Sequence, residues 1–294
     1  MINLLITGSN GFIGRNLLKY LAQTKRYAIH ATSRTNDAYP AEGYTFHPCD
    51  LTDERQVQEL LSLVQPDLII HTAALSAIEA CEANPKQAYQ LNVESVRWLT
   101  DWCQSHSAKL IQLSTDFVFQ GDVYLPYKET DTPNPVNVYG QTKLEAEQYI
   151  QAHLANFAIV RVVVVYGKPL PGQHTNIVEL IRAKYEANET IELASDQWRT
   201  PTYVGDVSQG IEQIIERKAT GIYHLCGPEE MSIYDMGAYI AKMLGIEQAP
   251  LQPVQSFPMD HTPKRPYYTA LSINKARKEL DYQPIKLKAY LGKK

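Results

Sequence analysis

The segment Ile2–Gly14, which reads INLLITGSNGFIG, decides the expected fold. Its first six residues are β-rich and mostly apolar, which predicts a buried strand, and apolar residues at helical spacing follow over Phe12–Thr24. Glycines collect in turns of every kind, so the three glycines Gly8, Gly11 and Gly14 alone would be a weak signal. Between a strand and a helix, however, glycines let the backbone approach a pyrophosphate at the helix N-terminus. The segment therefore predicts a dinucleotide site made by Gly8, Asn10, Gly11, Phe12, Ile13 and Gly14.

The end of the second expected strand, over 28–32, indicates which dinucleotide binds. An acidic residue about 20 positions after the glycines would hold the ribose hydroxyls of NAD. Here Ser33 and Arg34 follow the strand, and the first acid is Asp37. A guanidinium suits a 2′-phosphate in charge and geometry, although a solvated surface arginine is the alternative. We expect NADP(H) to be preferred, with NAD(H) also compatible.

Alternation of apolar runs and helix-period stretches continues through the first half of the chain. The expected strands span 44–47, 67–71, 109–114 and 159–165, and the expected helices span 54–64, 85–105 and 139–154. Strands of unalternated valine, isoleucine and leucine are typical of a parallel sheet covered on both faces. The fold class is therefore α/β, with a Rossmann-type doubly wound parallel sheet.

The second half is less regular and predicts a smaller α/β part. Helices are expected over 178–187, 204–216, 234–244 and 273–280, a strand over 221–226, and a proline-rich loop over 250–266. We expect residues 1–165 to form the dinucleotide-binding domain and residues 166–294 mainly to bind substrate. A segment near 200–226 is expected to pack back on the first domain.

Composition excludes several classes of partner. The 294 residues carry 28 Lys and Arg against 32 Asp and Glu, a net charge of −4, so no nucleic-acid footprint is expected. No run approaches the ~18 apolar residues of a membrane helix, and the N-terminus lacks the features of a signal peptide. The four cysteines are scattered without metal-ligand spacing, which favours free thiols, no metal site and a cytoplasmic location.

The sequence Tyr139-Gly140-Gln141-Thr142-Lys143 opens an expected helix and suggests acid–base chemistry. Residues i and i+4 share a helical face, and a nearby ammonium lowers the high pKa of a phenol. Tyr139 could then give a proton to a carbonyl oxygen as hydride reaches its carbon. By itself this common pattern is better explained as a solvated helix face. Thr115 ends the preceding strand, where ligands of doubly wound sheets bind, so we interpret Thr115, Tyr139 and Lys143 as one catalytic site.

Several longer motifs carry a resemblance to a known family. They are Thr7–Gly14, Cys49–Thr52, Pro66–Ala74, Glu79–Glu82, Leu91–Val93, Ser114–Gly121, Asn137–Glu145 and Arg265-Pro266. Together they cover most of the chain and resemble the extended short-chain dehydrogenase/reductases. Within them, the chain resembles the dTDP-4-dehydrorhamnose reductase family.

The resemblance implies an NAD(P)H-dependent reductase that delivers hydride to C4 of a 4-keto-6-deoxy nucleotide sugar. It implies that Thr115, Tyr139 and Lys143 do the chemistry. Besides Ser33 and Arg34 after the second strand, the expected cofactor contacts are Asp50, Leu51, Ala73, Ala74, Leu75 and Asn92. The substrate contacts it implies are Ser76, Thr115, Asp116, Phe117, Val164, Arg199 and Arg265, with the two arginines as candidates for the sugar's diphosphate or, equally, for salt bridges.

Departures from the family pattern leave alternatives open. Val164 stands where rhamnose-forming reductases have a tryptophan, which puts the sugar in question. Asn16 replaces a glutamate that contributes to a metal-bridged dimer in some members, so a homodimer is only a further expectation. A nucleotide-sugar epimerase or dehydratase with tightly bound NAD remains an alternative. So does a non-catalytic regulatory subunit of a methionine adenosyltransferase, which shares the family resemblance.

Overall fold

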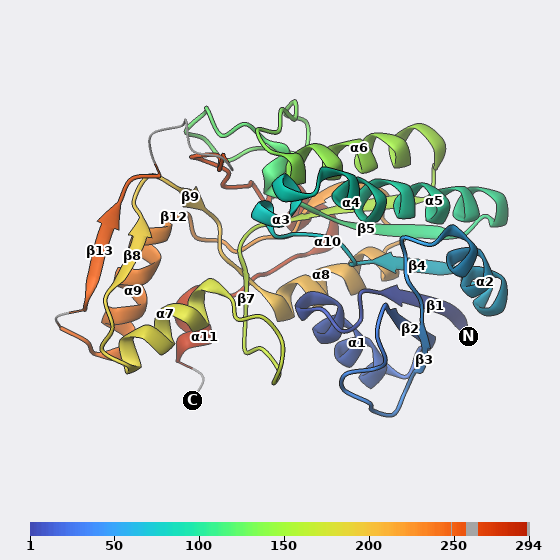
Figure 1. Ribbon diagram of the computed structural model, residues 1–294, viewed down its shortest axis with the longest axis horizontal. Coiled ribbons are helices and arrows are strands. Elements are labelled where there is room, and N and C mark those ends of the chain that lie inside the picture. The colour runs from blue at the N-terminus through green and yellow to red at the C-terminus, as the bar shows by residue number, and fades with distance from the viewer. Residues whose placement is uncertain (248, 257–263, 293–294) are drawn as a thin grey trace.

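The computed structural model describes residues 1–247, 249–256 and 264–292, and its centre is a seven-stranded parallel sheet (Figure 1). The strand order is β11-β6-β5-β4-β1-β2-β3. The strands are β1 (Ile2–Thr7), β2 (Tyr27–Ser33), β3 (Thr45–Pro48), β4 (Leu68–His71), β5 (Lys109–Thr115), β6 (Phe157–Val162) and β11 (Gly221–His224). The predicted α/β class with a parallel sheet is confirmed.

Helices cover both faces of this sheet, so its strands are buried on both sides. One hydrophobic cluster joins the sheet to α1 (Phe12–Thr24), α8 (Val204–Glu216) and α10 (Asn274–Leu280). The other joins it to α2 (Glu54–Val64), α5 (Ser95–His106) and α6 (Val138–His153). Since α8 packs on α1 and β11 extends the sheet beside β6, chain from beyond residue 200 is part of this layered core.

The order of strands reverses direction beside β1. The chain runs outward from β1 to β3 on one side and then from β4 to β11 on the other. Ligands of doubly wound sheets bind in the crevice outside the carboxyl ends of strands at such a reversal. This position lies next to the turn Gly8–Gly14, called the glycine turn below.

The connection from β4 to β5 differs from the predicted single helix over 85–105. It contains α3 (Ile78–Ala83), α4 (Pro85–Tyr89), a π-helical turn η1 (Gln90–Glu94) and then α5. The π turn holds Asn92, whose amide bridges the backbone of Leu75 (N to Oδ1, 2.8 Å) and the hydroxyl of Thr142 (3.0 Å). A π turn inside a helix commonly serves a local site, and here it aims Asn92 at the loop after β4.

A third hydrophobic cluster holds the smaller part of the molecule together. It comprises α7 (Ile177–Glu186), α9 (Ile233–Leu244) and residues around the parallel pair β8 (Ile191–Ala194) and β13 (Leu251–Val254). The prediction of a loop over 250–266 is wrong at Leu251–Val254, which is a strand, and residues 257–263 of that stretch lie outside the described part. In Figure 1 this part lies beside the carboxyl-end edge of the large sheet.

Short elements connect the two parts. They are β7 (Val165–Tyr166) paired with β10 (Thr202–Tyr203), β9 (Trp198–Arg199) paired with β12 (Met231–Ser232), the turn η2 (Asp116–Val118), and the helix α11 (Leu287–Leu291). No helix in the described residues has the length and apolar character needed to cross a bilayer.

Candidate active site

A cleft of about 750 Å³ lies at the carboxyl ends of the central strands and gathers most of the residues expected at the site. Its lining includes Gly8, Gly11, Phe12, Ile13, Gly14, Ser33, Arg34, Asp50, Leu51, Ala73, Ala74, Leu75, Ser76, Thr115, Asp116, Tyr139, Lys143 and Val164. Five expected residues are not in the lining: Asn10, Asn92, Phe117, Arg199 and Arg265.

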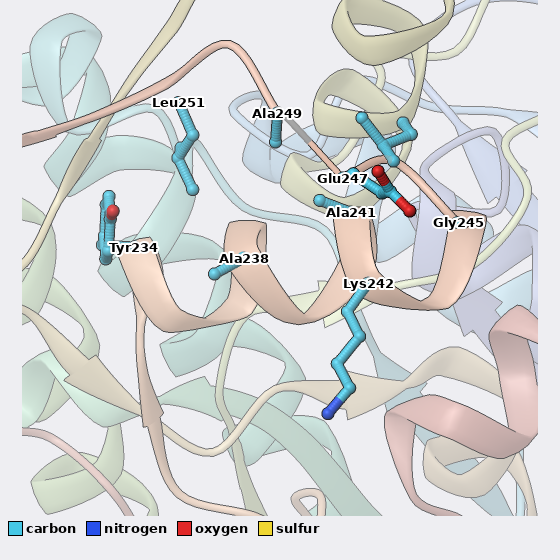
Figure 2. A pocket seen from close by; sticks show the side chains of 9 residues that line it. Tyr234, Ala238, Ala241, Lys242, Gly245, Glu247, Ala249 and Leu251 are labelled. Atoms are coloured by element: carbon cyan, nitrogen blue, oxygen red, sulfur yellow. The ribbon is translucent and has the colours of Figure 1, made fainter.

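A second hollow, of about 510 Å³, lies along α9 in the smaller part (Figure 2). Tyr234, Ala238 and Leu251 are among its lining residues, and in Figure 2 the amine of Lys242 points away from Leu251. Its lining combines apolar side chains with Tyr234, Lys242 and Glu247, and none of the expected site residues belongs to it. The first cleft is therefore the candidate site.

The glycine turn fits a dinucleotide because its backbone is packed too closely for side chains. Gly8 has φ +69°, and a Cβ on it would lie 2.7 Å from the nitrogen of Ala73. A Cβ on Gly14 would lie 2.3 Å from the carbonyl oxygen of Gly8. Gly11 precedes α1 without a side-chain cap among the described residues, so the first N–H groups of the helix face the cleft without a capping carboxylate or hydroxyl. That arrangement suits a pyrophosphate.

After β2, Arg34 lines the cleft, whereas the nearest acidic residue, Asp37, is bound by other side chains. The hydroxyl of Ser33 accepts a hydrogen bond from the backbone nitrogen of Asn10 at 2.9 Å, which ties the glycine turn to β2. The carboxylate of Asp37 accepts from the hydroxyl of Tyr44 at 2.5 Å and faces Arg15 at 3.5 Å. Because Asp37 is engaged there, Arg34 is the charged group that this stretch presents to the cleft.

The three expected catalytic residues meet at one wall of the cleft. Thr115 ends β5, while Tyr139 and Lys143 lie one turn apart on α6. Burial raises the pKa of the Tyr139 phenol and outweighs its hydrogen bond with Thr115, so the lowered pKa expected from the sequence is not the net result. Burial also lowers the pKa of Lys143 to about 8, and the carboxylate of Glu147 works against this shift.

Local structure explains why α6 begins beside Thr115. The side chain of Asn137 caps the helix by accepting a hydrogen bond from the nitrogen of Gly140 at 2.8 Å. A Cβ on Gly140 would lie 2.2 Å from the carbonyl oxygen of Phe117, so only glycine lets the helix approach η2 this closely. Phe117 thus supports the wall from behind, with its ring 6.2 Å from that of Tyr139.

Arg199 lies away from the cleft lining, although the resemblance implies a diphosphate contact. Its side chain is 2% exposed, and its Nε lies 3.5 Å from Asp116. Its terminal nitrogens donate to the carbonyl oxygens of Trp198 (2.8 Å), Pro266 (2.8 Å) and Tyr267 (3.0 Å). All three guanidinium nitrogens are therefore engaged within the protein, and Arg199 is a buried structural cation in this conformation.

Arg265 is also paired within the protein. It forms an ion pair with Glu79 on α3, and both side chains remain partly exposed, at 37% and 62%. This outcome is the salt bridge that the sequence allowed as the alternative. Because the pair is exposed, an incoming anion can compete for the guanidinium at small cost.

Val164 lines the cleft in an unusual backbone conformation, with φ +38°. A β-branched residue in this region is a rare outlier. Further lining residues were not expected from the sequence, namely Cys49, Thr52, Thr72, Gln87, Leu91, Leu113, Ser114, Val162 and Val165. Several adjoin predicted positions, so strand ends alone could have pointed to them.

Comparison with known proteins places the chain in a family. A family model described as "RmlD substrate binding domain" matches residues 2–293. A dTDP-4-keto-6-deoxy-D-glucose reductase from Streptomyces niveus is 29% identical, over 96% of this chain and 92% of its own. Methionine adenosyltransferase 2 subunit beta from Xenopus tropicalis is 32% identical, over 93% of this chain and 81% of its own.

A solved structure supports the same placement. The dTDP-4-dehydrorhamnose reductase from Bacillus anthracis, in complex with NADP, matches with a TM-score of 0.82 at 28% identity, covering 98% of this chain and 96% of that one. Sheet, glycine turn and family model agree, and the chain belongs to the RmlD substrate-binding-domain family.

Proposed function

We propose that the protein is an NADP(H)-dependent reductase of a 4-keto-6-deoxy nucleotide sugar. One observation carries the proposal: Thr115, Tyr139 and Lys143 converge on the cleft whose other end is the glycine turn. The reductases among the relatives support this reading. In it, residues 166–294 mainly supply the sugar-binding side, and Arg34 favours NADP(H) over NAD(H).

In this mechanism the chain binds and polarises the ketone. Bound reduced nicotinamide supplies the hydride for C4 of the sugar. The Tyr139 phenol donates its proton to the carbonyl oxygen, and the Thr115 hydroxyl hydrogen-bonds the same oxygen. The Lys143 ammonium stabilises the phenolate that Tyr139 becomes, because an adjacent positive charge favours the ionised form. Arg265 is proposed to leave Glu79 for the diphosphate of the substrate.

The cofactor contacts follow the geometry of the cleft. The glycine turn receives the pyrophosphate, Arg34 the 2′-phosphate, and Asp50 and Leu51 flank the adenine. Ala73, Ala74 and Leu75 form the groove wall, and Asn92 holds that wall through its bonds to Leu75. Ser76 and Val164 are proposed to face the sugar.

The test follows NADPH oxidation with dTDP-4-keto-6-deoxy-L-mannose, using NADH as the cofactor comparison. Tyr139→Phe should abolish turnover. Tyr149→Phe is a matched control, since Tyr149 lies on the same helix but donates to the exposed Asp101 at 2.8 Å. Equal turnover by Tyr139→Phe and the wild-type protein would refute the proposed role.

The subunit-like relative motivates a second candidate, a regulatory partner of a methionine adenosyltransferase. NADPH binding without sugar-dependent oxidation, together with co-purification of a synthetase, would favour it. Stoichiometric NAD in purified protein would instead favour an epimerase or dehydratase. We also propose a homodimer, which light scattering tests. A cytoplasmic location is a further prediction, which cell fractionation tests.

A further inference from the structure

A fully buried ion pair lies beneath the proposed catalytic wall and is not explained by the mechanism so far. The carboxylate of Glu147 on α6 accepts two hydrogen bonds from Arg161 of β6. Nε donates to Oε1 at 3.0 Å, and a terminal nitrogen donates to Oε2 at 2.6 Å. The two side chains are 0% and 2% exposed. Buried ion pairs stabilise proteins little compared with apolar residues of similar volume. The location of the pair therefore suggests a role other than stability.

Glu147 touches both elements that carry the catalytic side chains. It follows Lys143 by four residues and so lies on the same face of α6, one turn away. Its Oε1 also accepts a hydrogen bond at 2.5 Å from the hydroxyl of Ser114, the residue before Thr115 on β5. One carboxylate thus links β5, α6 and β6 directly behind the site.

The charges around Lys143 make Glu147 important for its ammonium. Glu147 on α6 and His71 on β4 interact electrostatically with Lys143, while Asp116 on η2 and Cys81 on α3 interact with Tyr139. His71 is neutral because burial lowers its pKa to about 3. Arg161 is positive and would repel a second cation, while Glu147 favours the charged form of Lys143.

We propose that Glu147, clamped by Arg161, is a positioning residue that keeps β5 and α6 in register and serves as the counter-ion of the Lys143 ammonium. The role in turnover rests on the proposed function, whereas the effect on the charge of Lys143 does not. Without the Glu147 carboxylate, the buried Lys143 ammonium keeps the Arg161 guanidinium nearby but loses its negative partner. Lys143 should then lose its proton at lower pH.

The primary test measures the ionisation of Lys143 in the protein without substrate. Competitive labelling of lysines with acetic anhydride across pH, read by peptide mass spectrometry, gives the midpoint for Lys143. In Glu147→Gln the midpoint should fall by about one pH unit or more, the size expected for loss of a close opposite charge. Glu145→Gln is the matched control, since Glu145 lies on the same helix but pairs with the partly exposed Arg97. An unchanged midpoint in Glu147→Gln would overturn the inference.

A second arm uses turnover. The basic limb of the kcat/KM profile for NADPH oxidation should move to lower pH in Glu147→Gln and return in part in Glu147→Asp. A lower kcat with an unmoved limb would indicate a purely structural role and overturn the inference. If the wild-type protein reduces no 4-keto sugar, the proposed function fails, and the labelling still decides the counter-ion role.

A variant with both charged residues replaced by methionine controls for misfolding of Glu147→Gln. Glu147→Met with Arg161→Met conserves volume and removes both charges, a change that buried pairs often tolerate. It should fold, and its Lys143 midpoint should lie between those of Glu147→Gln and the wild-type protein, because loss of the Arg161 charge partly offsets loss of the Glu147 carboxylate. A wild-type midpoint in both the double variant and Glu147→Gln, or loss of folding in both, would assign the pair to stability alone.

Discussion

Replacing Gly140 with alanine should separate the two elements that form the catalytic wall. The new Cβ would lie 2.2 Å from the carbonyl oxygen of Phe117 and 2.9 Å from the Cβ of Pro135. Carbon and oxygen atoms approach to about 3.3 Å, so α6 or η2 must move by about 1 Å. Overpacking of this kind costs about 1–3 kcal/mol. The higher helix propensity of alanine offsets up to about 1 kcal/mol of that cost.

The shift should impair catalysis more than stability, because Gly140 adjoins Tyr139 and Phe117 lies two residues after Thr115. We expect a loss of about 1–2 kcal/mol in unfolding free energy by urea titration. A misplacement of 1 Å can cost roughly 100-fold in turnover, so kcat for NADPH oxidation should fall by about that factor. Gln141→Ala changes an exposed neighbour in the same helical turn and should leave both quantities near wild type. Wild-type kcat in Gly140→Ala would refute the reasoning that this close approach sets the geometry of the site.

Three further changes test the cofactor, the buried histidines and the buried arginine. Arg34→Ala should lower the NADPH-to-NADH ratio of kcat/KM at least about tenfold, as expected for one charged hydrogen-bonded contact, and an unchanged ratio would count against the 2′-phosphate role. Burial lowers the pKa values of His71 and His224 to about 3 each, so both are neutral in the folded protein. The unfolded chain takes up protons below about pH 6.5, so stability is complete above that pH and falls below it, by up to about 2 kcal/mol per histidine at pH 5. His71→Asn should flatten this decline in urea titrations at pH 7 and pH 5, and an equally steep decline would refute the assignment. Arg199→Met should cost about 3–5 kcal/mol because it leaves Asp116 buried without its cation; a loss below about 1 kcal/mol in thermal and urea unfolding would show that the pair is dispensable.

Local patterns made most of the first half predictable. The strand β1 and the helices α1 and α2 match the expected ranges, because each is defined by an apolar run or a helical period in its own residues. The strand β13 was missed, since Pro253 and Gln252 interrupt its pattern. Its partner β8 lies about sixty residues earlier in the chain, and such a pairing leaves no local signal. The π turn η1 was missed as well, and the contact of its Asn92 with Leu75 spans 17 positions, which no local pattern shows.

The candidate site divides in the same way. Gly8, Tyr139 and Lys143 were found because their spacing on a turn or helix already implies a shared face. Arg199 was expected at a diphosphate through resemblance alone, and its burial depends on Asp116, which is 83 positions earlier and so outside any local pattern. Residue spacing predicts which side chains of one helix or strand share a face. It does not predict which other element packs over that face.

Val164 shows why the sugar is harder to read than the chemistry. Its positive φ costs on the order of 1–3 kcal/mol in a β-branched residue, so neighbouring contacts must hold it. They come from Thr202 on β10, whose nitrogen donates to the carbonyl oxygen of Val164 at 3.2 Å and whose hydroxyl donates to that of Val163 at 2.7 Å. The shape of this wall therefore depends on a strand nearly forty residues further along the chain. Because the strain is held by tertiary contacts, a substitution at Thr202 can alter the substrate side of the cleft while the Tyr139 and Lys143 motif stays intact.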